Sequence, residues 1–173
     1  MSKLKTETQL PQTIVSKSVI KTYVLTVSEF FPKTHNKSGL PTGFIDKIGS
    51  KIKKHTIRGN YPLWKKRIEE IQKGNAILSI RYWTGKPYKS KQKEAYVLDK
   101  NSGIGVQDLY FDDKRLSESF VSNETAVDGI QNYVSNEILA ENDGLSLVDF
   151  QEWFKGYGLN EPMAIVHFTA ERY

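Results

Sequence analysis

The apolar residues of this chain occur in short runs that are rich in β-branched and aromatic side chains, and Gly, Pro or Asn separates one run from the next. Runs of this kind are typical of β-strands, because branched and aromatic side chains pack well on a pleated surface. We predict strands over residues 22–31, 54–58, 76–83, 93–100, 105–111 and 163–169.

Short helices are predicted between these strands, at residues 44–52, 60–73, 126–142 and 146–157. In the first of them, apolar residues recur at spacings of three and four, which is the period of a helix. Asn60 and Ser146 are suitable N-caps for the second and the fourth. Strands mixed with short helices, without regular β-α-β alternation, predict an α+β fold built on a small β-barrel.

The length of 173 residues is enough for one domain. We expect the polar residues 1–20 to form a flexible N-terminal arm and residues 21–173 to form a single domain. No apolar run has the length of a signal-peptide core or a membrane span, which predicts a cytoplasmic protein without a membrane partner. Cysteine is absent, and His35, His55 and His167 are far apart in the sequence. We therefore predict no metal site and no cofactor.

The charges are divided unevenly along the chain. Residues 1–100 carry 21 Lys and Arg against 7 Asp and Glu, a surplus of 14 positive charges. Residues 101–173 carry 4 against 13, a surplus of 9 negative charges. A basic half of this size suits a polyanion or a phosphorylated small molecule, although lysine-rich solvated surfaces are also common.

The stretch KKHTIR, Lys53 to Arg58, resembles the Lys-x-x-Thr/Glu-x-Arg signature of ASCH domains, which belong to the PUA-like superfamily. The order of predicted elements from Thr22 to Arg172 is similar as well. The resemblance implies a PUA-like (ASCH) small β-barrel with flanking short helices. It also implies a cleft that receives a nucleobase, a nucleoside or an RNA segment.

Some small ASCH proteins resemble amidohydrolases that act on 4-acetylcytidine with a lysine, a threonine nucleophile and an acidic residue. The resemblance assigns these roles to Lys53, Thr56 and Asp143 of this chain. Glu141 is an alternative acid, because the family's enzymes use glutamate. The signature arginine corresponds to Arg58.

The period of a β-strand favours a different lysine. In a continuous strand, Lys54, Thr56 and Arg58 share one face, since side chains alternate with period two. Lys53 reaches Thr56 only if the chain still turns at that point. A threonine hydroxyl needs an adjacent base to act as a nucleophile, so both lysines remain candidates.

An arginine on the inner face of a small barrel needs an anion or several acceptors, which predicts a ligand at Arg58. Elsewhere, aromatic and basic residues alternate along the sequence, and this combination suits base stacking and phosphate contact. The residues predicted to bind ligand are Arg58, Tyr61, Arg81, Trp83, Lys86, Tyr88 and Lys89.

Two functions are compatible with these features. The first is an ASCH-like binding module for RNA or a modified nucleotide or nucleoside in a basic cleft. The second is a small amidohydrolase that acts on acylated nucleosides such as 4-acetylcytidine, with a threonine nucleophile and a lysine base. We favour the first, because the catalytic pattern is short and its acid is uncertain. Whether the protein is an enzyme remains open, and the sequence indicates no particular protein partner.

Overall fold

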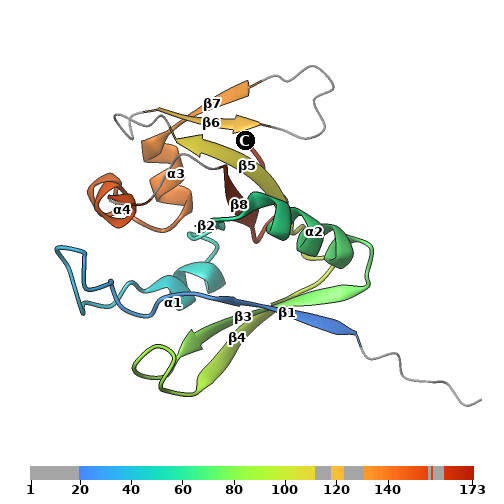
Figure 1. Cartoon of the computed structure of the whole chain (residues 1–173), viewed down its shortest axis with the longest axis horizontal. Helices are drawn as coiled ribbons and strands as arrows, with labels where there is room; N and C mark the ends of the chain where they lie inside the picture. The colour runs from blue at the N-terminus through green and yellow to red at the C-terminus, as the bar shows by residue number, and fades with distance from the viewer. Residues whose placement is uncertain (1–19, 112–117, 123–130, 156, 158–161) are drawn as a thin grey trace, which may run out of the picture.

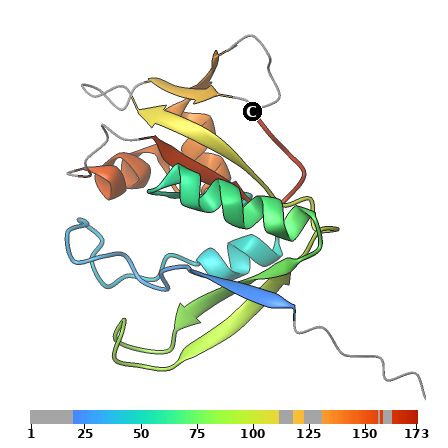
Figure 2. The same cartoon turned by 45° about the vertical axis from the view of Figure 1, so that its right-hand side comes forward.

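The computed structural model describes residues 20–111, 118–122, 131–155, 157 and 162–173. In this part of the chain, helices and strands form an α+β arrangement with two separate β-sheets (Figure 1). Helices lie between the sheets and beside the second one. The two views in Figures 1 and 2 both place the three-stranded sheet on one side of α2 (Tyr61–Gln72) and the five-stranded sheet on the other.

The first sheet has three strands in the order β1-β3-β4. Strands β1 (Lys21–Thr26) and β3 (Ala76–Trp83) run parallel, and β4 (Gln92–Leu98) pairs with β3 in the antiparallel direction. The parallel pair requires a long crossover connection. That crossover contains α1 (Phe44–Gly49), one strand of the other sheet and α2.

The second sheet is antiparallel throughout and has the strand order β2-β8-β5-β6-β7. Two of its strand pairs join segments far apart in sequence, since β2 pairs with β8 and β8 with β5. The strands are β2 (His55–Arg58), β5 (Gly105–Phe111), β6 (Glu118–Ser122), β7 (Gln131–Ser135) and β8 (Met163–His167).

Local signals in the sequence set the helix starts. The Asn60 side chain accepts a hydrogen bond from the backbone N–H of Leu63 at the start of α2, and Ser146 caps α4 (Leu147–Phe154) in the same way. Ser135 caps α3 (Asn136–Asn142) directly after β7. Helix α2 contributes the buried side chains of Trp64, Ile68 and Ile71 and contacts strands of both sheets, so one apolar core holds the two sheets together.

The predicted small β-barrel is wrong. The described strands form two open sheets, and β1 and β4 on one sheet and β2 and β7 on the other pair with only one neighbour each. A barrel closes only when its edge strands pair with each other. Here the side chains of α2 fill the space between the sheets instead, so the edges stay apart.

Several predicted boundaries also change. The predicted helix over residues 126–142 is wrong for residues 131–135, which form β7, while its last seven residues form α3. Residues 126–130 lie outside the described part, as do residues 1–19 of the predicted arm. The strand predicted at 22–31 ends at Thr26, and the strand predicted from Lys54 begins at His55. The chain also contains β6, which the sequence patterns did not indicate.

The structure also bears on the predictions about a membrane and a metal. No helix in the described ranges is long and apolar enough to cross a membrane. Among the same residues, no three His, Asp or Glu side chains lie together in a way that could hold a metal ion.

The packing predicts a strong dependence of stability on Ile165, which is fully buried in β8, an interior strand of the five-stranded sheet. Ile165→Ala should lower the free energy of unfolding by about 2–5 kcal/mol, because it removes buried methyl groups and leaves a cavity. Ile138→Ala is the matched control: the same substitution at a residue that is 48% exposed on α3 should change it by less than about 0.5 kcal/mol. Urea unfolding of both variants measures the difference, and equal losses would contradict the packing described here.

Candidate functional site

A cavity of about 110 Å³ lies where the end of β1, strand β2 and helix α4 meet. Four of the residues that line it come from the predicted site: Lys53, Thr56, Arg58 and Asp143. Phe44, Trp153, Phe154 and Met163 supply apolar walls. The cavity therefore combines hydrogen-bonding and charged groups with apolar walls, as small-molecule sites do, in a volume below their usual range of roughly 300–1,000 Å³.

The backbone between α1 and β2 places Lys53 in this cavity. Lys51 has a φ of 61°, a left-handed conformation that turns the chain after α1. The backbone N–H of Lys53 then donates to the carbonyl of Lys47 at 2.9 Å, so Lys53 still belongs to the turn. Strand β2 begins at His55, and its alternation directs Thr56 and Arg58 to the cavity.

Asp143 reaches the cavity because α3 ends there. Gly144 adopts a φ of 73°, and the N–H of Leu145 donates to the carbonyl of Ala140 at 2.8 Å, which closes a Schellman motif. A Cβ atom at Gly144 would lie 3.1 Å from Cβ of Lys53. The glycine thus permits both the left-handed turn and the close approach of the Lys53 chain.

Lys53 and Asp143 form a buried ion pair. The Lys53 Nζ atom donates to Oδ1 and to the backbone carbonyl of Asp143, at 2.6 Å in each case. It also lies 4.1 Å from the centre of the Phe44 ring. The two residues are 2% and 4% exposed, so removing either charge would leave the other buried and unpaired, at a large cost in free energy of folding.

Burial moves the two pKa values toward the neutral forms. It lowers the pKa of Lys53, and the nearby charges of Arg58 and Lys47 act in the same direction, while Asp143 opposes them. Burial raises the pKa of Asp143, against the attraction of Lys53. Both pKa shifts reduce the free-energy cost of the state in which Lys53 and Asp143 are both neutral. Only in its neutral form can a lysine accept a proton.

Thr56 and Arg58 both line the cavity and carry polar side-chain atoms. The Nζ atom of Lys53 donates to Asp143 and not to the Thr56 hydroxyl. Arg58 donates from Nη2 to the carbonyl of Thr26, but its buried Nε has no hydrogen-bond partner among the described residues. Buried donors without partners are costly, so a ligand acceptor near Nε would remove that cost.

The alternative lysine and the alternative acid lie elsewhere. Lys54 lines a separate small pocket on the other side of β2, and its Nζ atom donates to Glu171 at 2.7 Å. The side chain of Glu141 is exposed on α3 and does not line the cavity. The structure thus groups Lys53 and Asp143, not Lys54 and Glu141, with Thr56.

Of the residues predicted to bind ligand, Arg58 lines this cavity and the other six do not. Arg81 donates to Ser79 on the first sheet, and the Tyr61 hydroxyl is buried beside the core without a hydrogen-bond partner in the described part. Trp83 and Tyr88 contact each other at 5.3 Å between ring centres on the β3–β4 hairpin. Lys86 and Lys89 are exposed on the same hairpin.

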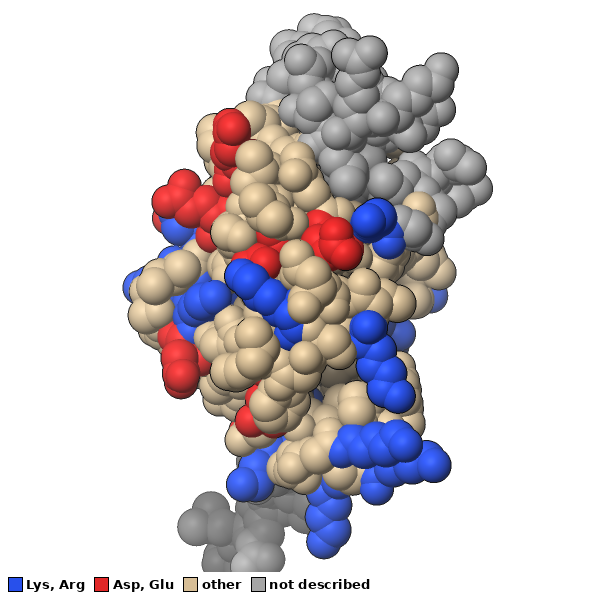
Figure 3. All heavy atoms as spheres, turned by 90° about the vertical axis from the view of Figure 1, so that its left-hand side faces the viewer, with Lys and Arg blue, Asp and Glu red and all other residues tan. Residues whose placement is uncertain are grey.

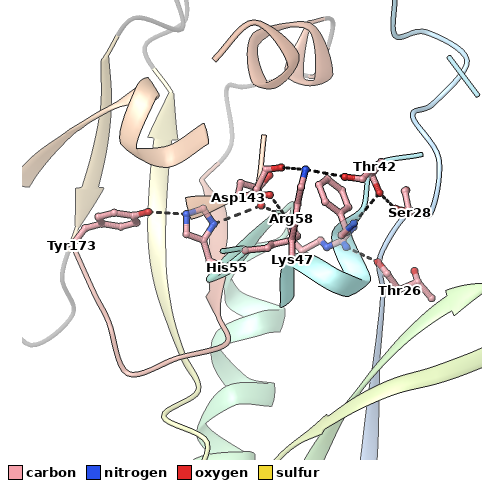
Figure 4. A network of polar contacts seen from close by, with 11 residues as sticks. Thr26, Ser28, Thr42, Lys47, His55, Arg58, Asp143 and Tyr173 are labelled. Carbon is pink, nitrogen blue, oxygen red and sulfur yellow. Dashed lines mark hydrogen bonds and ion pairs between the residues drawn. The ribbon is translucent and has the colours of Figure 1, made fainter. Parts of the chain in front are cut away.

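Three residues of the site escaped the sequence analysis. Lys47 donates to the carbonyls of Thr42 and Gly144 and so ties α1 to the end of α3. Tyr157, which is 52% exposed, lines the cavity. His55 lies behind Asp143, where Figure 4 shows it between that carboxylate and Tyr173. Among these, only His55 carried a sequence signal, since it lies inside the KKHTIR stretch.

Scanned against models of protein families, the chain matches none of them, and searches of curated proteins and of solved structures also find no match. The resemblance to ASCH domains therefore stays a prediction from a short signature. Six residues are too few to assign a family. The cavity, by contrast, brings together side chains from distant parts of the chain.

The buried ion pair predicts a pronounced asymmetry between single and double substitutions. Lys53→Met should lower the free energy of unfolding by about 3–5 kcal/mol at neutral pH, because it leaves the Asp143 carboxylate buried without a counter-charge. The loss should be smaller at about pH 4, since the raised pKa lets Asp143 take up a proton as pH falls. Urea unfolding at the two pH values measures both effects.

Two controls accompany this test. Adding Asp143→Leu to Lys53→Met removes both charges and should recover most of the loss. Lys21→Met breaks an exposed ion pair with Glu70 and should cost less than about 1 kcal/mol. A double variant as unstable as Lys53→Met alone would show that the pair is not what Lys53 contributes.

Proposed function

We propose that the protein is a binding module for a nucleoside or nucleotide, with Arg58 as the main polar contact in the cavity. The observation that carries this proposal is the Arg58 side chain: the residue lines the cavity, and its buried Nε atom has no hydrogen-bond partner within the described ranges. A carbonyl, ring nitrogen or phosphate oxygen of a ligand would supply the missing acceptor. The resemblance to ASCH domains supplies the ligand class.

The size of the cavity restricts what can enter. A cavity of roughly 150 Å³ is enough to enclose a benzene ring, so 110 Å³ holds a somewhat smaller group. A substituted edge of a base fits, whereas an RNA strand does not. The remainder of a nucleoside would lie beside Tyr157, whose partly exposed ring offers a stacking surface.

Arg58→Ala should weaken the binding of cytidine or 4-acetylcytidine by about 1.5–3 kcal/mol, since it removes a charge-assisted hydrogen bond from a partly buried site. Isothermal titration calorimetry with each nucleoside measures the loss. Arg67→Ala is the control, because Arg67 stacks on Tyr23 and Trp64 and does not line the cavity. Equal affinities of the two variants, or no binding by the wild-type protein, would contradict the proposal.

A second function is amide hydrolysis, and the convergence of Lys53, Thr56 and Asp143 on one cavity favours it. In this reaction the Thr56 oxygen attacks the acyl carbon of an acylated nucleoside while Lys53, in its neutral form, takes the hydroxyl proton. The C–N bond then breaks, the proton goes to the leaving amine, and water hydrolyses the acyl-threonine. Because Lys53 donates to Asp143 and not to Thr56, a bound substrate has to bring the amine and the hydroxyl together.

Thr56→Ala should reduce acetate release from 4-acetylcytidine at least about a thousandfold and leave its binding largely intact, because only the attacking oxygen is lost. Thr56→Ser keeps a hydroxyl and should retain part of the rate. Chromatographic separation of cytidine from 4-acetylcytidine follows the reaction. A wild-type protein that binds the nucleoside through Arg58 but releases no acetate would refute hydrolysis and leave the binding proposal standing.

RNA is a larger ligand compatible with the same proposal, and its contacts would lie outside the cavity. On the face shown in Figure 3, basic side chains predominate toward the lower end and acidic ones toward the upper end. The β3–β4 hairpin carries the exposed Lys86 and Lys89 beside Tyr88, a residue that is 89% exposed. Exposed rings next to lysines suit the stacking and phosphate contacts of single strands.

A further inference from the structure

A chain of polar contacts leads from the cavity through strand β2 to its opposite side. Asp143 Oδ1 accepts from Lys53 in the cavity and lies 3.7 Å from Nδ1 of His55. On the far side of the imidazole, Nε2 is 2.7 Å from the hydroxyl of Tyr173. Figure 4 shows this order of Tyr173, His55 and Asp143.

Hydrogen bonds hold both the main chain and the hydroxyl of Tyr173. Gln107, which is 1% exposed in β5, donates from its amide to the carbonyl of Tyr173 and accepts from its backbone N–H, at 3.0 Å each. Asn142, the last residue of α3, donates from Nδ2 to the Tyr173 hydroxyl at 2.8 Å. Because its main chain and its hydroxyl are both held, Tyr173 presents that hydroxyl to His55 in a defined direction.

These contacts determine which nitrogen of His55 carries hydrogen. Burial holds the pKa of His55 well below its ordinary value, so the ring is neutral and has one N–H. The carboxylate of Asp143 faces Nδ1 at 3.7 Å, which favours a hydrogen on Nδ1, and the Tyr173 hydroxyl, which accepts from Asn142, then donates to Nε2. The N–H of the ring is therefore at Nδ1. In the other tautomer, the Nδ1 lone pair would face the Asp143 carboxylate.

The Nδ1 atom is buried and has no hydrogen-bond partner within the described residues. Its separation from Asp143 Oδ1 is too long for a hydrogen bond, yet the N–H dipole directed at the carboxylate favours the charged form of Asp143. A charged Asp143 in turn favours the ammonium form of Lys53.

We propose that His55 and Tyr173 are positioning residues for the cavity: Tyr173 fixes the Nδ1–H tautomer of His55, and His55 keeps Asp143 charged against Lys53. This inference deepens the proposed function and rests on it for its importance, because it concerns the protonation of two groups that a ligand in the cavity meets. Neither His55 nor Tyr173 lines that cavity. Both line the pocket on the opposite side of β2.

Other charged and titratable groups also face this chain of contacts. They have to be held constant in any test, because each of them acts on Lys53, His55, Asp143 or Tyr173 through space. They are Lys47 of α1, Lys54, Arg58 of β2, His167 of β8 and Glu171.

Nitrogen-15 NMR of the protein without added nucleoside tests the proposal directly. At neutral pH the wild-type protein should show the Nδ1–H tautomer of His55, and Tyr173→Phe should shift the population toward Nε2–H, because the proton donor to Nε2 is gone. In the same variant, the titration midpoint of the Lys53 ammonium should move to lower pH. Tyr96→Phe is the matched control: it removes a hydroxyl that donates to the carbonyl of Ile45, and it should change neither signal.

The outcomes separate the two proposals. A wild-type His55 in the Nε2–H form would overturn the inference without any variant, even if Tyr173→Phe folds poorly. An unchanged Lys53 midpoint in a folded Tyr173→Phe protein would overturn it as well. Both measurements use no ligand, so a failure to bind nucleosides would refute the proposed function and leave this inference intact.

Discussion

The contact between Lys53 and Asp143 is the interaction on which the rest of the site depends. The two residues are 90 positions apart in the chain, and each is buried, so neither charge is tolerable without the other. Their pairing fixes the turn after α1 against the end of α3. Strand β2 starts from that turn, and the directions of Thr56 and Arg58 follow from where it starts.

The sequence predicted much of the local structure but not the way in which the strands assemble. The strand at residues 76–83 agrees with β3, because its branched and aromatic residues are unambiguous. The predicted barrel is wrong, because strand patterns in the sequence do not reveal which edge strands pair. The predicted helix over 126–142 is wrong for residues 131–135, which form β7. Ser135 caps α3 and so marks where the helix begins, a boundary that apolar spacing alone does not show.

The site residues show a similar division. Strand alternation favoured Lys54 as the lysine beside Thr56. The strand begins only at His55, because the chain still turns after the left-handed Lys51, and the Lys54 side chain lies on the other side of β2. Four residues that the KKHTIR resemblance and its matching acid predicted line one cavity. The basic and aromatic stretch around Arg81 and Tyr88 does not line it, since those residues belong to the first sheet and its hairpin. Nothing in the sequence linked Tyr173 to His55, because that contact depends on the pairing of β5 with β8, in which Gln107 of β5 holds Tyr173.

Arg58 also connects the two sheets. Its guanidinium extends from β2 of the five-stranded sheet and donates to the carbonyl of Thr26, the last residue of β1 in the three-stranded sheet. Val27 and Ser28, which follow β1, line the same cavity. A molecule bound there would be held by both halves of the protein at once. Its binding free energy would stabilise the folded state and would couple the unfolding of the two sheets.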